Sequence, residues 1–468
     1  MGLLLLAQIL KSQGHDVRII DFVFLQSCKG LRPPSLAQEI RDYLPDVVGI
    51  SIFTYHYDEA LETIDLVNRT TDAPIVLGGP HVSIFPDDFA YDTRISYLVC
   101  GEAESEIVSV VEQAKRQSEP MIIRCQPVKP EEIPQASLEP LYGVEYLKEY
   151  QIQLSRGCPF QCSFCVIGQT AGRRIRERPL EQCIQELSNA KNKYPQIMSI
   201  AITDDCPTFH KERFKGFLNS LASAKLGCML TIDNLRAKDV DEELIELCKK
   251  AGGRNLCIGV ESGNVEVFEG LNKGETLEEI KHAAQIIRNK RLALGLCFVI
   301  GLPGDNILKH RDSIVLAKAM KADYIYWNML VPWPGTRVEE WYQKNGGIGE
   351  MRNFSTLISP DLSWQTPPVW SGSFPSRDLI RAWLSANLET YCISMRFKNL
   401  LRIIKVAREY ELWRSAWIYF GGKLPHYLAV NIRTVYRIAR SLGPLFLVKL
   451  ITYHIVKKIP ISHHKVGD

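Results

Sequence analysis

The segment SRGCPFQCSFC, residues 155–165, directly follows a predicted strand at 151–155 and places Cys158, Cys162 and Cys165 within eight residues. Thiolate sulfur is a soft ligand that suits iron, so three thiolates at this spacing can hold one iron–sulfur cube. A cube contains four irons. Three protein ligands therefore leave the fourth iron open to a substrate or cofactor.

A structural zinc site is the alternative for these cysteines. Zinc normally takes four ligands, often as two separated pairs. The sequence has no clear partner pair, although Cys183 and Cys206 are candidates. The chain has 13 cysteines, an odd number, and most are scattered singly. This pattern favours reduced thiols and a cytoplasmic location over a disulfide framework.

Downstream of the cysteines, strand and helix patterns alternate. Six predicted strands are separated by helical segments, which indicates an incomplete (β/α)6 barrel. The reactive groups of such a barrel gather at the C-terminal ends of its strands, because the loops there converge on one mouth. The predicted strands are 151–155, 198–203, 229–233, 255–260, 294–300 and 323–329.

A second α/β pattern lies upstream, in residues 1–118, and predicts an open, doubly wound parallel sheet. The pattern begins with a helix at 4–13, so the first strand of such a domain is expected to be missing. Residues 119–145 are rich in proline and predict a linker. The strands predicted upstream are 16–21, 47–52, 74–77 and 95–99.

Residues 346–468 predict a mainly helical, basic C-terminal region. Residues 391–468 contain 14 Lys and Arg against 3 Asp and Glu, whereas the net charge of the whole chain is only +3. We favour a helical cap that packs on the barrel, and contact with an anionic membrane surface is the alternative. No apolar run reaches the roughly 18 residues of a membrane span. No recognition motif indicates nucleic acid.

Together these features resemble a known superfamily. The spacing of three and then two residues between the cysteines, with Phe164 before the last one, is similar to the radical S-adenosylmethionine (SAM) signature. Residues 146–345 resemble the barrel of that superfamily, and residues 1–118 resemble a Rossmann-like cobalamin (B12)-binding domain. The resemblance implies a [4Fe–4S] cluster on the three cysteines, SAM on the open iron, and cobalamin as a further cofactor.

The resemblance also implies a SAM site at the strand ends of the barrel. An aspartate pair after the second strand is expected to attract the methionyl amine, and the Glu-Ser-Gly string after the fourth strand to contact the ribose or carboxylate. The competing interpretations are strand-end turns, a surface arginine after the third strand, and simple packing. The implied SAM contacts are Phe164, Asp204, Asp205, Arg236, Glu261, Ser262, Gly263 and Gly301.

Cobalamin contacts are expected in the loops after three front-domain strands, where glycines permit close backbone approach and hydroxyls can bond the cofactor. The chain has no Asp-x-His-x-x-Gly motif, so no histidine ligand to cobalt is assigned. His56 and His81 are expected to be ordinary loop histidines. The implied cobalamin contacts are Ser51, Thr54, Gly78, Gly79, Ser83, Gly101 and Glu102.

The expected activity is reductive cleavage of SAM to modify an unactivated carbon, with cobalamin-dependent C-methylation, a transferase reaction, as the first hypothesis. No catalytic residue beyond the cluster ligands is assigned. The alternatives are an anaerobic radical cyclase or rearrangement enzyme and a non-catalytic cluster or cobalamin sensor. The expected partners are a small-molecule substrate, hydrophobic if the C-terminal region faces a membrane, and a one-electron reductant such as flavodoxin or ferredoxin.

Overall fold

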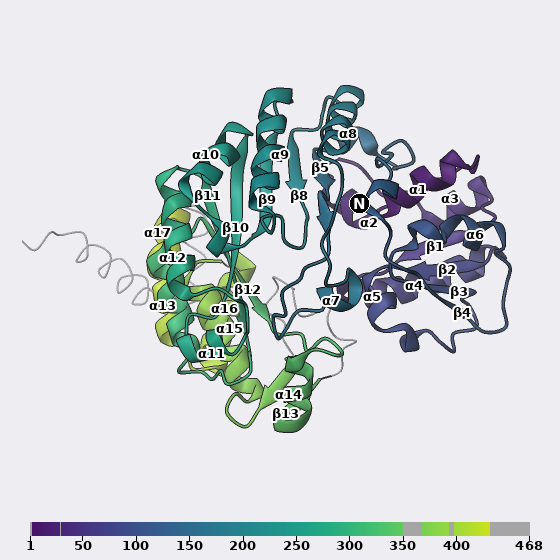
Figure 1. Ribbon diagram of the computed structural model, residues 1–468. Helices are drawn as coiled ribbons and strands as arrows, with labels where there is room; N and C mark the ends of the chain where they lie inside the picture. Colours follow the sequence, from purple (N-terminus) through teal and green to yellow (C-terminus); the bar gives the residue numbers. More distant parts are fainter. Residues whose placement is uncertain (1, 29, 350–366, 393–396, 431–468) are drawn as a thin grey trace, which may run out of the picture.

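The computed structural model describes residues 2–28, 30–349, 367–392 and 397–430. It contains a front α/β domain, a larger α/β domain and a group of C-terminal helices (Figure 1). The remainder of the basic region, residues 431–468, lies outside the described residues.

The front domain is a four-stranded parallel sheet covered on both faces. Ile75 and Leu77 pack in one apolar cluster, whereas Val76 packs in another, so alternate residues of one strand face opposite helix layers. This arrangement confirms the doubly wound fold. The strands, in spatial order, are β1 (Val48–Ser51), β2 (Ile75–Gly78), β3 (Tyr97–Cys100) and β4 (Met121–Arg124). The helices are α1 (Gly2–Ser12), α2 (Phe22–Ser27), α3 (Leu36–Tyr43), α4 (Tyr57–Thr70), α5 (Pro80–Ile84) and α6 (Ile107–Glu112).

Two segments of the front domain differ from expectation. The predicted strand at 16–21 does not form; only Ile19 makes an isolated bridge, to Leu141. The segment pairs with a neighbour at this one position only, and β1 forms the edge of the described sheet. Conversely, β4 forms inside the predicted linker and pairs with β3. Its flanking prolines stand outside the paired residues, so they do not interrupt the strand.

The second domain is a six-stranded parallel sheet, which confirms the partial barrel. The strands lie in the order β12-β11-β10-β9-β8-β5, with helices on the outer face (Figure 1). The strands are β5 (Glu149–Ile152), β8 (Ser199–Ile202), β9 (Met229–Leu235), β10 (Gly253–Glu261), β11 (Ala293–Ile300) and β12 (Tyr324–Met329). The helices are α8 (Leu180–Lys193), α9 (Lys211–Ala224), α10 (Glu242–Lys250), α11 (Val265–Glu269), α12 (Leu277–Asn289) and α13 (His310–Met320).

The barrel core lies between this sheet and its outer helices. In β11, Leu294, Leu296 and Phe298 are 0% exposed and belong to this core, so the alternate Cys297 faces the inner side. Each such buried apolar side chain contributes roughly 2 kcal/mol. Polar residues begin the helices: Asp241 caps α10, and Thr276 with Glu279 forms a capping box on α12. The sequence thus encodes both the faces and the ends of these elements.

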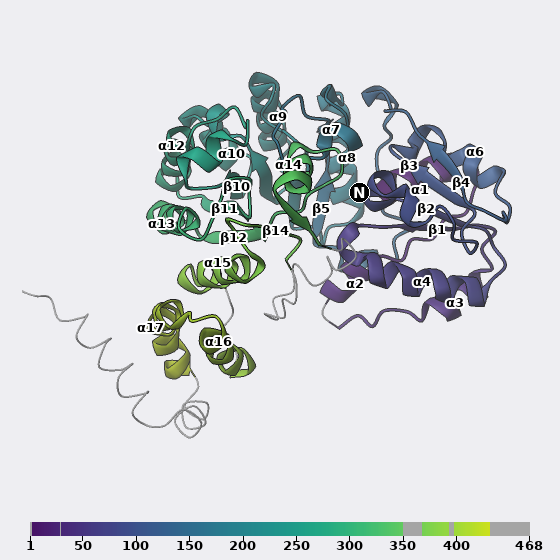
Figure 2. The same cartoon turned by 90° about the horizontal axis from the view of Figure 1, so that it is seen from below.

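The C-terminal region is helical as far as it is described. After α14 (Arg337–Asn345) and the hairpin of β13 (Gly346–Ile348) and β14 (Val369–Ser371), α15 (Ser376–Glu389) packs on the barrel. Helices α16 (Phe397–Glu409) and α17 (Trp413–Val430) follow beyond it (Figure 2). None of the helices in the described ranges combines the length and apolar character needed to cross a bilayer.

Candidate functional site

The three cysteines lie in one closed loop at the C-terminal end of β5. The loop, residues 157–175, is bounded by β6 (Ser155–Arg156) and β7 (Arg176–Glu177), which pair antiparallel, and it contains the short helix α7 (Ile167–Thr170). We call this segment the cluster loop. Gly157 opens it with φ +92°, and a Cβ at this position would overlap the carbonyl oxygen of Arg174. Glycine is therefore required at this turn.

The donor set of the cluster loop fits an iron–sulfur cube. All three thiols are free and partly buried. A hydrogen bond from Cys206 lowers the pKa of Cys158 to about 7, whereas burial raises the pKa of Cys162 to about 11. Among the described residues, no three His, Cys, Asp or Glu side chains converge on a single metal ion. A cube takes one thiolate on each of three irons, so its ligands need not converge on one point.

The structure separates the two cysteines named for the zinc alternative. Cys206 lies beside Cys158. Cys183 is 0% exposed and packs in the barrel core on α8. The zinc alternative therefore loses one of its two proposed donors, because this thiol packs among apolar side chains.

Asp204 and Asp205 follow β8 and accept hydrogen bonds from the residues that lead into the cluster loop. The Asp204 carboxylate accepts hydrogen bonds from the Leu154 amide at 2.7 Å and the Ser155 hydroxyl at 2.5 Å. Burial raises the pKa of Asp204 to about 7. Asp205 accepts a bond from the Gly157 amide at 2.9 Å. Sequence reasoning missed this supporting role, and their predicted contact with the SAM amine stays a prediction.

Glu261 ends β10 in an unusual backbone conformation, with φ +64°. Its carboxylate lies 3.2 Å from the ammonium of Lys273, which is equally close to Glu275. Burial opposes the charge on Lys273, but the two carboxylates outweigh it and raise the lysine pKa. Lys273 also attracts the Cys162 thiolate electrostatically. No sequence spacing indicated this lysine, because α11 separates it along the chain from Glu261.

Several other predicted SAM residues have structural partners. Gly263 lies against α13, where a Cβ would come within 2.8 Å of the Ser313 backbone. Ser262 is buried and accepts a bond from the amide two residues later. Gly301 has φ +89°, and its carbonyl accepts a bond from Tyr342 at 2.6 Å. Their predicted contacts with SAM stay predictions.

Arg236 and Phe164 both lie close to the cluster loop or its support. The Arg236 guanidinium stands 4.0 Å over the ring of Phe160, between the first two cysteines. It also donates to the Gly274 carbonyl at 2.8 Å. Arg236 is thus more than a surface arginine. Phe164 is partly buried and packs against the barrel core.

The predicted cobalamin residues lie at the carboxyl ends of β1, β2 and β3. Gly79 has φ +96°, and a Cβ there would meet the Ser51 hydroxyl at 2.8 Å. Ser83 accepts a bond from the Gly101 amide at 2.9 Å. The loops after the three strands are therefore tied together by these small residues, which also include Gly78 at the end of β2.

His81 is buried rather than exposed in a loop. It is 3% exposed in α5, with Nδ1 3.2 Å from the Thr54 hydroxyl and Nε2 3.3 Å from Asp88. Burial lowers its pKa. Both ring nitrogens therefore lie beside protein groups, and the expectation that no histidine binds cobalt stays a prediction. His56 stands at the start of α4, 3.8 Å from Glu59.

The carboxyl edge of the front sheet meets the cluster loop. Helix α5, which follows β2, contacts α7 in the cluster loop (Figure 1). The ring of Phe85 stands 6.1 Å from Trp333 in the loop after β12. Glu102, after β3, forms an ion pair with Arg156 at 3.1 Å. The two sets of predicted cofactor residues therefore face a common region.

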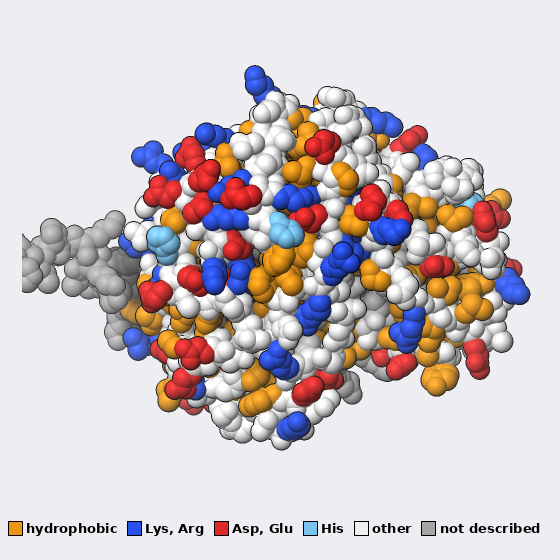
Figure 3. Space-filling model, viewed as in Figure 1, with side chains coloured by type: hydrophobic (Ala, Val, Ile, Leu, Met, Phe, Trp, Pro, Cys, Tyr) orange, Lys and Arg blue, Asp and Glu red, His pale blue; other side chains and the backbone are white. Residues whose placement is uncertain are grey.

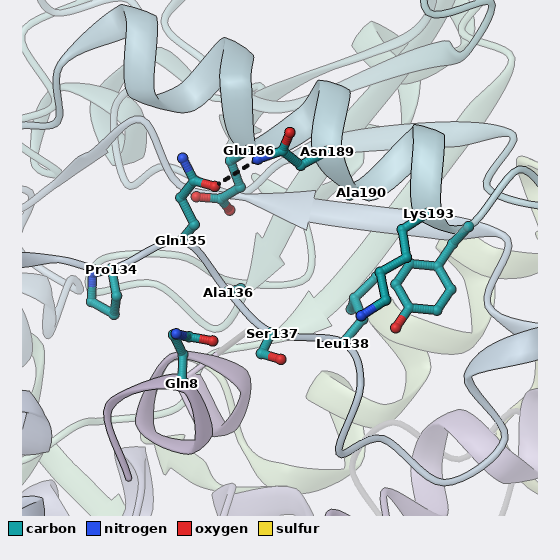
Figure 4. A pocket seen from close by; sticks show the side chains of 11 residues that line it. Gln8, Pro134, Gln135, Ala136, Ser137, Leu138, Glu186, Asn189, Ala190 and Lys193 are labelled. Carbon is teal, nitrogen blue, oxygen red and sulfur yellow. Dashed lines mark hydrogen bonds between the residues drawn. The ribbon is translucent and has the colours of Figure 1, made fainter. Parts of the chain in front are cut away.

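A cavity of about 400 Å³ lies elsewhere, between α1, residues 134–138 and α8 (Figure 4). Its lining includes Glu186 and Lys193, and Gln135 accepts a hydrogen bond from Asn189 across it. The C-terminal end of α8 leads to the start of β8, on the side of the sheet opposite the cluster loop. We therefore assign this cavity no part in the candidate site.

Comparison with known families agrees with this geometry. The family description "B12 binding domain" matches residues 1–111, and "Radical SAM superfamily" matches residues 152–315. The barrel is thus a radical SAM domain, and a B12-binding domain stands in front of it.

Curated relatives cover much of the chain. An uncharacterized methyltransferase of Pyrococcus horikoshii is 28% identical over 76% of this chain and 82% of its own length. An anaerobic magnesium-protoporphyrin IX monomethyl ester cyclase of Rubrivivax gelatinosus is 25% identical over 76% of this chain and 69% of its own length. The relatives thus include two kinds of reaction.

Solved structures share the fold. The radical SAM methyltransferase TsrM of Kitasatospora setae, solved with cobalamin and a [4Fe–4S] cluster, superimposes with a TM-score of 0.63 at 17% identity. That match covers 85% of this chain and 87% of TsrM. OxsB, a cobalamin-dependent SAM radical enzyme solved with aqua-cobalamin and SAM, gives a TM-score of 0.54 at 17% identity and covers 86% of this chain and 68% of OxsB.

Proposed function

We propose that this protein is a cobalamin-dependent radical SAM methyltransferase that acts on an unactivated carbon. The observation that carries the proposal is the meeting of the front sheet's carboxyl edge with the cluster loop, through α5, α7 and Glu102. A cofactor bound over that edge would face a cofactor bound by the three cysteines. In this class, the reduced cluster supplies the electron that cleaves SAM, and cobalamin supplies the methyl group.

The residues of the chain orient these groups and exclude water. Asp205 fixes the amide of Gly157 at the start of the cluster loop. Lys273 brings a buried positive charge close to Cys162, and Glu261 holds that charge in place. Buried charged groups that ion pairs hold in place are already oriented before the reaction. They can therefore stabilise charge that develops in the reaction without having to reorient.

We propose that the substrate lies on the inner face of the barrel sheet. Asp233, Cys257, Cys297 and Tyr326 stand at positions that alternate with core residues, and they interact electrostatically with one another. Tyr326 is 53% exposed, and the sulfurs of Cys257 and Cys297 lie 3.4 Å apart. This mixed polar and aromatic lining favours a small molecule that carries both polar and apolar groups.

The test is an anaerobic assay of reconstituted protein with hydroxocobalamin, a strong reductant and SAM labelled on its methyl group. A methyltransferase should produce S-adenosylhomocysteine and labelled methylcobalamin beside 5′-deoxyadenosine. Formation of 5′-deoxyadenosine without S-adenosylhomocysteine would refute methyl transfer. The Cys158→Ala variant is the matched control and should yield no 5′-deoxyadenosine, because it lacks one ligand of the cluster that supplies the electron.

An anaerobic cyclase is the second candidate, because one relative that matches 76% of this chain is named as such. It predicts 5′-deoxyadenosine alone in the same assay.

A one-electron reductant such as flavodoxin or ferredoxin stays a predicted partner. On the face shown in Figure 3, charged side chains of both signs are interspersed, in line with the small net charge.

A further inference from the structure

Four charged side chains join the front domain to the base of the cluster loop. Glu102 and Glu104 follow β3, whereas Arg156 and Arg176 belong to β6 and β7. Arg156 binds Glu102 at 3.1 Å and Glu104 at 2.7 Å, and Arg176 binds Glu102 through both terminal nitrogens, one of them at 2.8 Å. The four side chains are only 7–12% exposed. We call them the interdomain ion cluster.

The two arginines need these carboxylates. Arg156 and Arg176 are direct partners in the antiparallel pair that closes the cluster loop. Like charges directly opposite each other destabilise a strand pair, and a buried charge without a partner costs more. Two carboxylates balance two guanidinium groups, and both carboxylates come from the other domain.

The ionisation of the cluster agrees with this balance. Burial opposes the charge on Glu102, but bonds from Arg176 and the Val128 amide outweigh it and lower the carboxyl pKa. Glu102 is therefore charged at neutral pH, as its ion pairs with the two arginines require.

The two arginines are coupled to the cysteines through the chain and through backbone hydrogen bonds. Arg156 stands two residues before Cys158, and the Cys158 amide donates to the Gly172 carbonyl at 3.1 Å across the loop. Arg176 also donates to the Ala171 carbonyl at 3.0 Å. A shift of the two arginines would therefore move both ends of the cluster loop.

We propose that Glu102 and Glu104 are positioning residues that hold the cluster loop closed, so that the geometry of the three cysteines depends on the front domain. The predicted contact of Glu102 with cobalamin would then place one loop against both cofactors. The inference rests on the proposed function for the identity of the bound cluster, but loop closure itself does not depend on it.

The first test is hydrogen exchange on the full chain, comparing wild type with Glu102→Gln. This change leaves two buried guanidinium groups with one carboxylate, so amides of residues 157–176 should exchange at least about tenfold faster. Glu119→Gln is the matched control, since Glu119 is an exposed carboxylate of the same domain. It should leave the loop unchanged.

A double variant and a spectrum complete the test. Glu102→Gln with Arg176→Gln should recover much of the loop protection, because the uncompensated charge is removed. Electron paramagnetic resonance of the reduced, reconstituted protein should show a weaker SAM-induced change in Glu102→Gln than in Glu119→Gln. Unchanged exchange in the loop, or equally faster exchange throughout the barrel strands, would overturn the proposal. Failure of methyl transfer alone would leave the exchange result intact.

Discussion

Asp204 provides a prediction in which the pH dependence can be worked out in advance. Its carboxyl group is 1% exposed, and burial raises its pKa from 3.8 to about 7. The folded protein therefore holds this proton to a higher pH than the unfolded chain does. The favourable contribution is fully present below about pH 4 and is lost as the pH rises through about 7.

The Asp204→Asn variant removes this dependence while keeping the contacts. Its amide oxygen can accept from the Leu154 amide, and its NH2 group can donate to the Ser155 hydroxyl, as a protonated carboxyl does. At 1.36 kcal/mol per pKa unit, wild type should lose about 2 kcal/mol relative to the variant between pH 5.5 and pH 8.5. Asp205 is present in both proteins, so its own titration largely cancels in the difference.

The measurement is urea unfolding of the cluster-free full chain at both pH values, followed by the fluorescence of the barrel tryptophans. Asp204→Ala is the comparison, since it loses both acceptors and should be less stable than Asp204→Asn at either pH. A difference between wild type and Asp204→Asn that stays constant from pH 5.5 to 8.5 would show that this carboxyl group is not the buried acid described here.

Three further outcomes are expected. Cys206→Ser should keep the iron content and visible absorption of wild type, whereas Cys158→Ala should lose both; iron loss in Cys206→Ser would instead indicate four protein ligands. Burial lowers the pKa of His310 to about 4, so stability should fall by up to about 3 kcal/mol as pH drops from 6.5 to 4, and His310→Gln should remove that slope in thermal unfolding. Glu389, 1% exposed, binds two basic side chains of α13 that are themselves 37–38% exposed; Glu389→Gln should cost about 1–3 kcal/mol, whereas the exposed Glu411→Gln should cost under about 1 kcal/mol, and equal melting temperatures would contradict this.

The strands of the barrel could be predicted from sequence because each one carries its own signal. A buried strand such as β11 is almost continuously apolar. The cysteine triplet follows β5 and so marks the first strand of the barrel. The segment at 16–21 was also expected to form a strand, yet it makes only one isolated bridge, because a strand needs a neighbour that pairs along its length. The local pattern contains no information about that neighbour.

Candidate site residues were harder to predict for a similar reason. Gly79 and Gly263 correctly indicate close approach, and the protein backbone and side chains that approach them could not be named from sequence. Lys273 was missed because its partner Glu261 precedes it along the chain by a whole helix, α11. A glycine in the sequence can indicate that there is no room for a Cβ atom at that position. Only the folded structure shows which atoms occupy that room.

The interdomain ion cluster shows that the barrel domain depends on contacts with the front domain. Composition divides the chain at a proline-rich linker after residue 118, and each side has its own apolar core. The loop with the three cysteines depends on both sides of this division, because Arg156 and Arg176 form their ion pairs with carboxylates of the front domain. An excised barrel would retain the strands and lose the charge balance at the base of its cluster loop. The two domains therefore fold around separate cores, whereas ion pairs between them hold the base of the cluster loop.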